Sequence, residues 1–260
     1  MPRVPFRAAL ALCAAAFAPL ATGCGSESDA EAAAMDEATA DGAVPASSQD
    51  PPNTLTDIEA ADGWALLFDG VSMEAWRTYG QEGLHDGWQA EDGMIVRVAG
   101  GGDIITRETW ADFELQLEWR VEEGGNSGVF FRASEESGRI FEGAPEMQVL
   151  DDAVHVDGQN PLTSAGANYG LHPAPRGVVR PAGEWNHARI RVEGERVQHW
   201  LNGEQIVDYR LGSPEWQALV AASKFAEWPE YGTYASGHIG LQDHGDRVYF
   251  RNLKIRRLDG

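Results

Sequence analysis

Cysteine is scarce in this sequence: only Cys13 and Cys24 occur in 260 residues, and both lie near the N-terminus. The rest of the chain therefore offers no disulfide bond, no thiol nucleophile and no thiolate metal ligand. A hydrophobic content of 43% over this length is enough for one sizeable core. A single domain without covalent cross-links accounts for the composition.

Basic residues are also few. The chain has 20 Lys and Arg against 41 Asp and Glu, which gives a formal net charge of −21. Such a chain repels the phosphate backbone, so no nucleic-acid partner is expected.

Long hydrophobic runs are absent apart from Ala8–Leu20, which is too short to cross a membrane as a helix. Arg3 and Arg7 precede this run, so residues 1–23 are predicted to be a signal peptide. The segment Leu20-Ala21-Thr22-Gly23-Cys24 is similar to the lipobox of bacterial lipoproteins, in which the cysteine is lipidated. We therefore expect export and a lipid anchor on Cys24 in the bacterial cell envelope. An ordinary signal peptide followed by an incidental cysteine is the alternative.

The segment Gly25–Ala60 contains nine acidic residues but no basic and no aromatic residue. Low hydrophobicity with charge of one sign is typical of disorder. Residues 24–61 are thus predicted to be a lipidated, disordered tether, and residues 62–260 to be the folded domain. Gly25 gives no inner-membrane retention signal of the aspartate kind, which favours the outer membrane, facing the periplasm or the surface.

The folded part shows the patterns of β-strands. Phe113–Val121 alternates apolar and polar residues over nine positions, which indicates a strand with one buried face. Asp92-Gly93 and Asn202-Gly203 are hairpin turns, and Ser213-Pro214 opens one short helix. At least eight to ten strands and no repeat predict an all-β, antiparallel β-sandwich.

The sequence also indicates one strand irregularity and positions for three polar side chains. The change of parity in the last strand indicates a bulge near Asn252. The segment Glu123–Gly128 is a tight glycine-rich link; if the strands on either side of it pair as a hairpin, Asn126 and Ser127 lie at the rim of that hairpin. Arg132 would then reach the sheet face, where it pairs with Glu146 or grips a substrate hydroxyl.

The segment Glu146–Asp151 is the best candidate for a ligand-binding floor. In a strand, Glu146 and Gln148 share one face while Met147 and Val149 enter the core. A bulge near Leu150 would return Asp151 to the polar face. The alternative is that this segment is a solvent-facing sheet edge that binds no ligand.

Two loops carry further candidates. Residues 152–183 form a long Gly-, Pro- and Asn-rich segment that contains Tyr169; such a loop is commonly functional, and a disordered insert is the alternative. Lys224–Gly237 contains four aromatic residues, which are suited to stacking on sugars.

Taken together, the motifs resemble the 3-keto-disaccharide hydrolase domain family over about Asp62 to Leu258. In chain order they are Gly63-Trp64 to Gly70, Trp88 to Gly93, Asp112 to Leu115, Gly125 to Arg132, Glu146 to Asp151, Pro181 to Asn186, Trp200 to Gly203, Gly240 to Gly245 and Val248 to Ile255. The resemblance implies a concanavalin A-like jelly roll and action on sugars whose carbon 3 is a ketone. Such a ketone makes the hydrogen on carbon 2 acidic, so a base can remove it and expel the glycosidic oxygen from carbon 1; hydration then completes a net hydrolysis.

His244 is the first candidate for base or acid, because imidazole titrates near neutral pH. Glu146 is the alternative base, and Arg132 or Lys224 would stabilise the enolate oxygen. The residues expected to bind substrate are Asn126, Gln148, Asp151, Tyr169, Lys224, Gln242 and Asp243. The substrate is expected to be an oxidised di- or oligosaccharide or glycoside, which a partner sugar dehydrogenase would supply.

Two other functions remain open at this stage. A lectin-like carbohydrate-binding module would use the same face without chemistry. A retaining glucanase is third, because Glu146-x-Gln148-x-x-Asp151 keeps the spacing of that signature but replaces its middle carboxylate by an amide. No cofactor is required; a divalent cation on Asp151, Asp152, His155 and Asp157 is a further possibility.

Overall fold

The computed structural model of the chain describes residues 51–258. The predicted signal peptide, the lipidation site Cys24 and the tether up to residue 50 lie outside the described residues. Within the described range, no helix combines the length and the apolar character needed to cross a bilayer.

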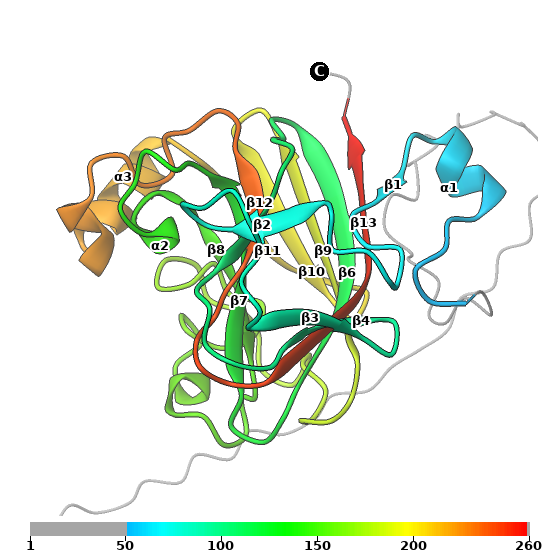
Figure 1. Ribbon diagram of the computed structural model, residues 1–260. Coiled ribbons are helices and arrows are strands. Elements are labelled where there is room, and N and C mark those ends of the chain that lie inside the picture. Colours follow the sequence, from blue (N-terminus) through cyan, green and yellow to red (C-terminus); the bar gives the residue numbers. More distant parts are fainter. Residues whose placement is uncertain (1–50, 259–260) are drawn as a thin grey trace, which may run out of the picture. The chain divides into compact units, whose positions relative to one another are not determined.

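Two antiparallel sheets pack face to face, as predicted (Figure 1). The larger sheet has eight strands: seven follow the order β11-β10-β9-β6-β13-β4-β3, and β1 pairs with β13. Their bounds are β1 Ala65–Leu66, β3 Trp88–Glu91, β4 Met94–Arg97, β6 Phe113–Val121, β9 Asn186–Glu193, β10 Arg196–Leu201, β11 Glu204–Arg210 and β13 Val248–Arg257.

The smaller sheet has five strands in the order β2-β5-β12-β7-β8. Their bounds are β2 Trp76–Thr78, β5 Ile104–Thr106, β7 Asn126–Ala133, β8 Glu146–Leu150 and β12 His238–Leu241.

The core lies between the two sheets and follows from side-chain alternation. On β6 the apolar positions from Phe113 to Val121 are buried, and on β7 and β8 Val129, Phe131, Met147 and Val149 enter the same core. The nine-residue strand predicted from its pattern is confirmed to the residue. The hairpins β3–β4 and β10–β11 also form around the predicted turns.

The strands on either side of Glu123–Gly128 do not pair as a hairpin, because β6 and β7 belong to different sheets. The short connection between them passes from one sheet to the other, and Asn126 and Ser127 lie within β7. Gly124 adopts a φ of 71°, which favours glycine, and its N–H donates to Asp151 at 2.8 Å. The alternation in each strand fixes which face is buried, but it does not decide whether the two apolar faces lie side by side or opposite each other.

The folded part begins earlier than the sequence composition predicts. Residues 57–61 form helix α1 (Asp57–Ala61), with a capping box between Thr56 and Glu59. Asn53 is buried; its N–H donates to Asn252 Oδ1 at 2.6 Å, and its Oδ1 accepts from Asn252 N at 2.8 Å. The assignment of residues 51–61 to a disordered tether was therefore wrong. Asn252 has a φ of 53° beside a register shift, which confirms the predicted bulge.

Four further short helical elements are present: α2 Ile140–Gly143, α3 Pro214–Ala221 and the 3-10 helices η1 Val156–Gln159 and η2 Lys224–Glu227. Helix α3 is the predicted one, and Ser213 caps it. Trp216 of this helix is buried, and Ser223, which follows the helix, caps η2. In Figure 1, α2 and α3 lie together, away from α1.

Candidate active site

The outer face of the smaller sheet carries a row of buried polar side chains on β7 and β8. Because Met147 and Val149 point into the core, Glu146 and Gln148 point to the outer face; Asn126 and Gly128 share that face on the neighbouring strand. Asn126, Glu146 and Gln148 are all buried. This arrangement confirms the facing predicted for β8.

Glu146 occupies a space that only glycine leaves open. A Cβ at Gly128 would lie 2.0 Å from Glu146 Oε1, so the carboxyl group rests against the bare backbone of β7. Burial raises the pKa of Glu146 to about 8. The nearby Lys224 lowers this pKa, whereas Asp103 and Asp157 raise it further. Glu146 is therefore mostly protonated at neutral pH.

The long loop after β8 is tied to that strand. The N–H of Tyr169 donates to Glu146 O at 3.0 Å, and the N–H of Gln148 donates to Ala167 O at 3.0 Å. Burial, followed by the charge of Asp157, raises the pKa of Tyr169 to about 12. The loop thus covers the outer edge of the sheet and places Tyr169 beside Glu146.

Lys224, at the start of η2, closes another side of the site. Its Nζ lies 4.4 Å from the ring centroid of Tyr169, 5.2 Å from that of Phe225 and 5.9 Å from that of Phe141. An ammonium group over aromatic faces is held in place by cation–π attraction. The site therefore combines a cation with aromatic rings, of which Phe225 belongs to the aromatic loop and is itself buried.

Asp103, just before β5, is a second carboxyl group with a perturbed pKa. Burial raises its pKa to about 6, with Asp243 contributing in the same direction. The N–H of Asp243 donates to Asp103 at 2.8 Å, while the Asp243 carboxylate pairs with Arg97 at 2.7 Å and accepts the N–H of Gly101 at 2.8 Å. Asp243 therefore organises the turn that carries His244.

His244 is exposed and lies beside Asn126. Its Nε2 is 3.4 Å from the Asn126 carboxamide nitrogen, and His155 Nε2 is 3.5 Å from the same atom. The two imidazole rings are 6.3 Å apart. Two histidines from distant parts of the chain thus meet at one amide.

Several buried acceptor atoms on this face have no hydrogen-bond partner among the described residues. They are Asn126 Oδ1, Glu146 Oε1, Gln148 Oε1 and Gln242 Oε1. Buried polar atoms normally find partners, so such a set suits a ligand with several hydroxyl groups.

The sequence profile of the 3-keto-alpha-glucoside-1,2-lyase-like domain family matches residues 63–256. The chain belongs to this family. A 3-keto-disaccharide hydrolase of Bacteroides thetaiotaomicron is 36% identical over 231 residues, covering 76% of this chain and 80% of that protein.

Two Parabacteroides distasonis crystal structures, provisionally described as those of glycosyl hydrolases, share the architecture. One is 34% identical with a TM-score of 0.75, covering 80% of this chain and all of that chain. The other is 31% identical with a TM-score of 0.59, covering 75% and 99%. The resemblance and the concanavalin A-like sandwich expected from the sequence are thus confirmed.

Arg132 does not join the polar face of this family member. Its φ is 50°, and Phe131 and Arg132 together oppose the single residue Ile239 of β12, which is a β-bulge. The guanidinium therefore leaves the expected face: it pairs with Asp112 at 3.1 Å and donates to Ala111 O at 2.9 Å. The expectation that Arg132 pairs with Glu146 was wrong.

Arg132 instead lines an apolar groove of about 890 Å³ beside α3 and η2. The walls include Trp216, Trp228 and Tyr231, and the Arg132 guanidinium in the groove is already paired with Asp112. Convergent groups with perturbed pKa values lie at Glu146 instead, so we place the candidate active site there.

Asp151 also departs from its predicted place. The β7–β8 ladder runs without a shift to Leu150, so the expected bulge is absent from this strand pair. The Asp151 carboxylate accepts the N–H groups of Gly124 at 2.8 Å and Ala153 at 3.1 Å. Each carboxylate oxygen of Asp151 thus accepts a backbone N–H group of a neighbouring turn. Asp151 therefore has a structural role here, in contrast to the expectation that it binds sugar.

The residues considered as cation ligands have other partners. Asp152 accepts the N–H of Ala165 at 2.8 Å, and His155 Nδ1 accepts the N–H of Asp157 at 3.1 Å. Across residues 51–258, no group of three or more His, Cys, Asp or Glu side chains is arranged to hold a metal ion.

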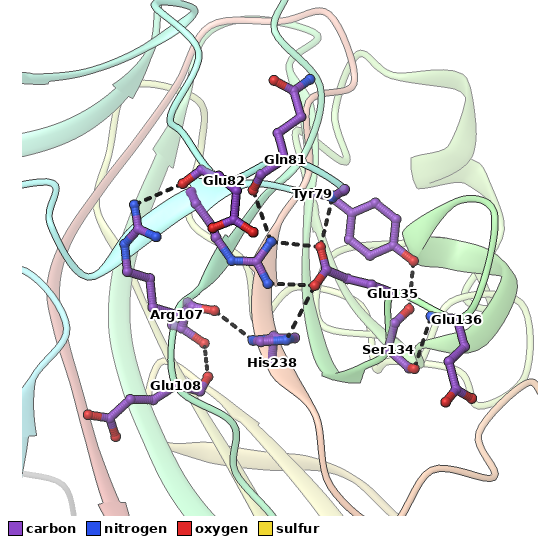
Figure 2. A network of polar contacts seen from close by, with 12 residues as sticks. Tyr79, Gln81, Glu82, Arg107, Glu108, Ser134, Glu135, Glu136 and His238 are labelled. Atoms are coloured by element: carbon purple, nitrogen blue, oxygen red, sulfur yellow. Dashed lines mark hydrogen bonds and ion pairs between the residues drawn. The ribbon is translucent and has the colours of Figure 1, made fainter.

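A separate charged cluster lies on the same sheet at β2, β5 and β12 (Figure 2). Arg77 donates two hydrogen bonds to Glu135, at 2.6 and 2.5 Å, and lowers the pKa of Glu135. His238 faces Glu135 with its Nε2 at 4.0 Å, and its Nδ1 is 2.6 Å from Thr106 O. These groups satisfy one another, so the cluster stabilises the sheet edge.

The sequence patterns gave no indication that Asp103 belongs to the site, and they suggested His155 only as a cation ligand. Asp103 follows the glycine run Gly100–Gly102, which is an ordinary turn signal. Its partner Asp243 is 140 residues away. Only the three-dimensional structure brings these groups beside Glu146 and His244.

Proposed function

We propose that this protein cleaves the glycosidic bond of sugars that carry a ketone at carbon 3, by elimination across carbons 1 and 2 followed by hydration. The observation that carries the proposal is Glu146: a buried carboxyl group with a pKa of about 8, on a face whose other unpartnered acceptor atoms belong to neutral carboxamides. Membership of the family, and the activity in the name of the Bacteroides relative, support the substrate class.

The spacing of the candidate groups suits one sugar ring. Glu146 rests against Gly128, and His244 lies beside Asn126. These two positions of β7 are two residues apart, which is roughly 7 Å along a strand. An acid and a base can therefore reach neighbouring atoms of a single ring.

Glu146 is proposed as the acid. Its raised pKa keeps the proton on the carboxyl group at neutral pH, so it can protonate the glycosidic oxygen as the bond from carbon 1 breaks. In a buried site a neutral carboxyl group also avoids the cost of an unpaired charge.

His244 is proposed as the base that removes the proton from carbon 2. The electron pair of that C–H bond forms the enolate, whose negative oxygen Lys224 is proposed to stabilise. The enolate then reforms the ketone and expels the oxygen on carbon 1 as a carbon–carbon double bond forms between carbons 1 and 2. Water adds across that bond, and the released sugar keeps its ketone.

Asn126, Gln148, Tyr169 and Gln242 are proposed to bind hydroxyl groups. Their carboxamide or phenol groups border the same face, and the ring of Tyr169 offers a flat surface for the sugar. Asp243 is proposed to position His244, because its contacts fix the turn that carries His244.

A retaining glucanase mechanism fits poorly. It needs a second carboxylate about 5 Å from the first, free to attack carbon 1. Asp151, which stands at that position of the signature, uses both oxygens on backbone N–H groups.

The test is turnover of a disaccharide and of its 3-keto derivative by the purified protein and its variants. Wild type should cleave only the keto sugar, and Glu146→Gln and His244→Ala should each lose about 100-fold or more in kcat. Glu136→Gln, which changes an exposed carboxyl group in the turn after β7, should behave as wild type. Cleavage of the unoxidised disaccharide would revive the glucanase alternative. Binding of both sugars without cleavage would indicate a carbohydrate-binding module.

A further inference from the structure

Asn126 stands between two histidines, and the hydrogen-bond pattern around it determines where their protons lie. We propose that the Asn126 carboxamide turns its oxygen toward both Nε2 atoms, so that His244 carries its proton on Nε2 and presents Nδ1 as the basic nitrogen. Asn126 would then be a positioning residue for the proposed base. This inference rests on the proposed function only for its catalytic meaning.

The first step concerns His155. Its Nδ1 accepts the N–H of Asp157 at 3.1 Å, as the cap of η1. A nitrogen that accepts a hydrogen bond carries no proton, so neutral His155 must carry its proton on Nε2. That Nε2–H group lies 3.5 Å from the Asn126 carboxamide.

The second step concerns the orientation of Asn126. With Nδ2 facing His155 Nε2, two donors face each other, and the buried Oδ1 has no partner. Oxygen and nitrogen of a carboxamide occupy interchangeable positions, so the hydrogen-bond network decides between them. Rotating the group by 180° removes the donor–donor contact and gives Oδ1 a hydrogen bond, and it moves the Nδ2 group to the side that has no protein partner, where it can donate to a ligand oxygen.

The third step concerns His244. Its Nε2 lies 3.4 Å from the same Asn126 position, which the rotation makes an acceptor. An acceptor there favours the tautomer with the proton on Nε2. Nδ1 of His244 then has the free lone pair that a base requires. The backbone N–H of Asp157 thus sets the tautomer of His155, His155 sets the orientation of the Asn126 carboxamide, and Asn126 sets the tautomer of His244.

The same chain contains internal references for this assignment. His85 Nδ1 accepts the N–H of Gly87 at 3.1 Å, so His85 should also carry its proton on Nε2. His199 and His238 have Nδ1 at 3.1 and 2.6 Å from carbonyl oxygens, so both should carry the proton on Nδ1. One spectrum can therefore show both tautomers at reference histidines whose hydrogen bonds define the position of the proton.

The experiment is a long-range ¹H–¹⁵N correlation spectrum of the purified, ¹⁵N-labelled protein at about pH 8.5, with signals assigned through single His→Gln variants. We expect His155 and His244 to give the Nε2–H pattern, and His199 and His238 the opposite pattern. A proton on Nδ1 of His155 or His244 in the wild-type protein would overturn the inference without any variant.

Two variants separate a positioning role from a structural one. Asn126→Asp keeps an acceptor between the rings, so His244 should keep its proton on Nε2. Asn126→Ala removes the acceptor, so His244 should show a mixture of tautomers while His155, held by Asp157, stays unchanged. An unchanged His244 in Asn126→Ala would contradict the inference. The readout needs no substrate, so its failure is distinct from failure to cleave a 3-keto sugar.

Discussion

Replacing Glu146 by glutamine should make the protein more stable at alkaline pH while it abolishes turnover. The carboxyl group is 6% exposed, and burial raises its pKa from 4.5 to about 8. The folded protein therefore holds this proton more tightly than the unfolded chain does. Because the folded state binds the proton at pH values where the unfolded chain has released it, stability falls as pH rises from about 4.5 to about 8 and then levels off.

The magnitude follows from the size of the shift. Each pKa unit corresponds to about 1.4 kcal/mol, so the free energy of unfolding should fall by about 3 kcal/mol between pH 5 and pH 8 on account of this one group. Glutamine does not titrate, so Glu146→Gln avoids that loss. A typical domain has only about 5–15 kcal/mol of stability, so the effect is measurable.

The assay is urea unfolding of wild type and Glu146→Gln at about pH 5 and pH 8. Both proteins contain all the other titrating groups. The difference between their free energies of unfolding therefore changes with pH only because of Glu146. Glu136→Gln, at an exposed position, serves as the control and should follow wild type. If the difference between wild type and Glu146→Gln stays constant from pH 5 to pH 8, the pKa of Glu146 is not raised and its role as the acid fails.

Two further predictions concern the surroundings of the site. Gly128→Ala should lower kcat at least 10-fold, because the new Cβ would lie 2.0 Å from Glu146 Oε1 and displace the carboxyl group; unchanged kcat would show that the carboxyl position is not critical. Glu135→Gln should lower the free energy of unfolding by about 1 kcal/mol at neutral pH, since its partly exposed side chain loses an ion pair. The Arg77 pairing lowers the pKa of Glu135, so this stabilisation is present above the unfolded pKa of 4.5 and is lost as pH falls through the lower folded value. Urea unfolding at neutral and acidic pH checks this, and an equal difference at both would contradict it.

Much of the fold follows from local sequence patterns. The β6 strand was predictable to the residue because one of its faces is core and the other is not, and this forces strict alternation. The Asp92-Gly93 and Asn202-Gly203 turns were predictable because both need positive φ angles, and Asp92 and Asn202 do adopt them.

The failures share one physical cause, which is that partners distant in sequence override local signals. Asn53 lies in an acidic, Pro-rich segment typical of disorder, yet it is fixed by Asn252, 199 residues away. Arg132 leaves the predicted face because a bulge against β12 inserts one extra residue, and the pattern Val129–Arg132 contains no sign of it.

The part of the candidate site that lies on a single strand was predictable from the sequence. Glu146 and Gln148 share a face by alternation alone, and His244 stood out as a titratable group beside glycine. Asp103 was missed because a buried aspartate after a glycine run looks like part of a turn. The tautomer argument at Asn126 needs contacts among three separate segments, which no local pattern contains.

Removal of the carbon 2 proton is the central claim, and a deuterium substitution tests it most directly. The rate of cleavage should be compared for a 3-keto disaccharide with hydrogen and with deuterium at carbon 2, at a substrate concentration far below KM. Elimination breaks this bond, so the deuterated sugar should be cleaved more slowly, by a primary isotope effect on kcat/KM. Direct displacement at carbon 1 leaves the bond intact, so equal rates for the two sugars would contradict the proposed elimination.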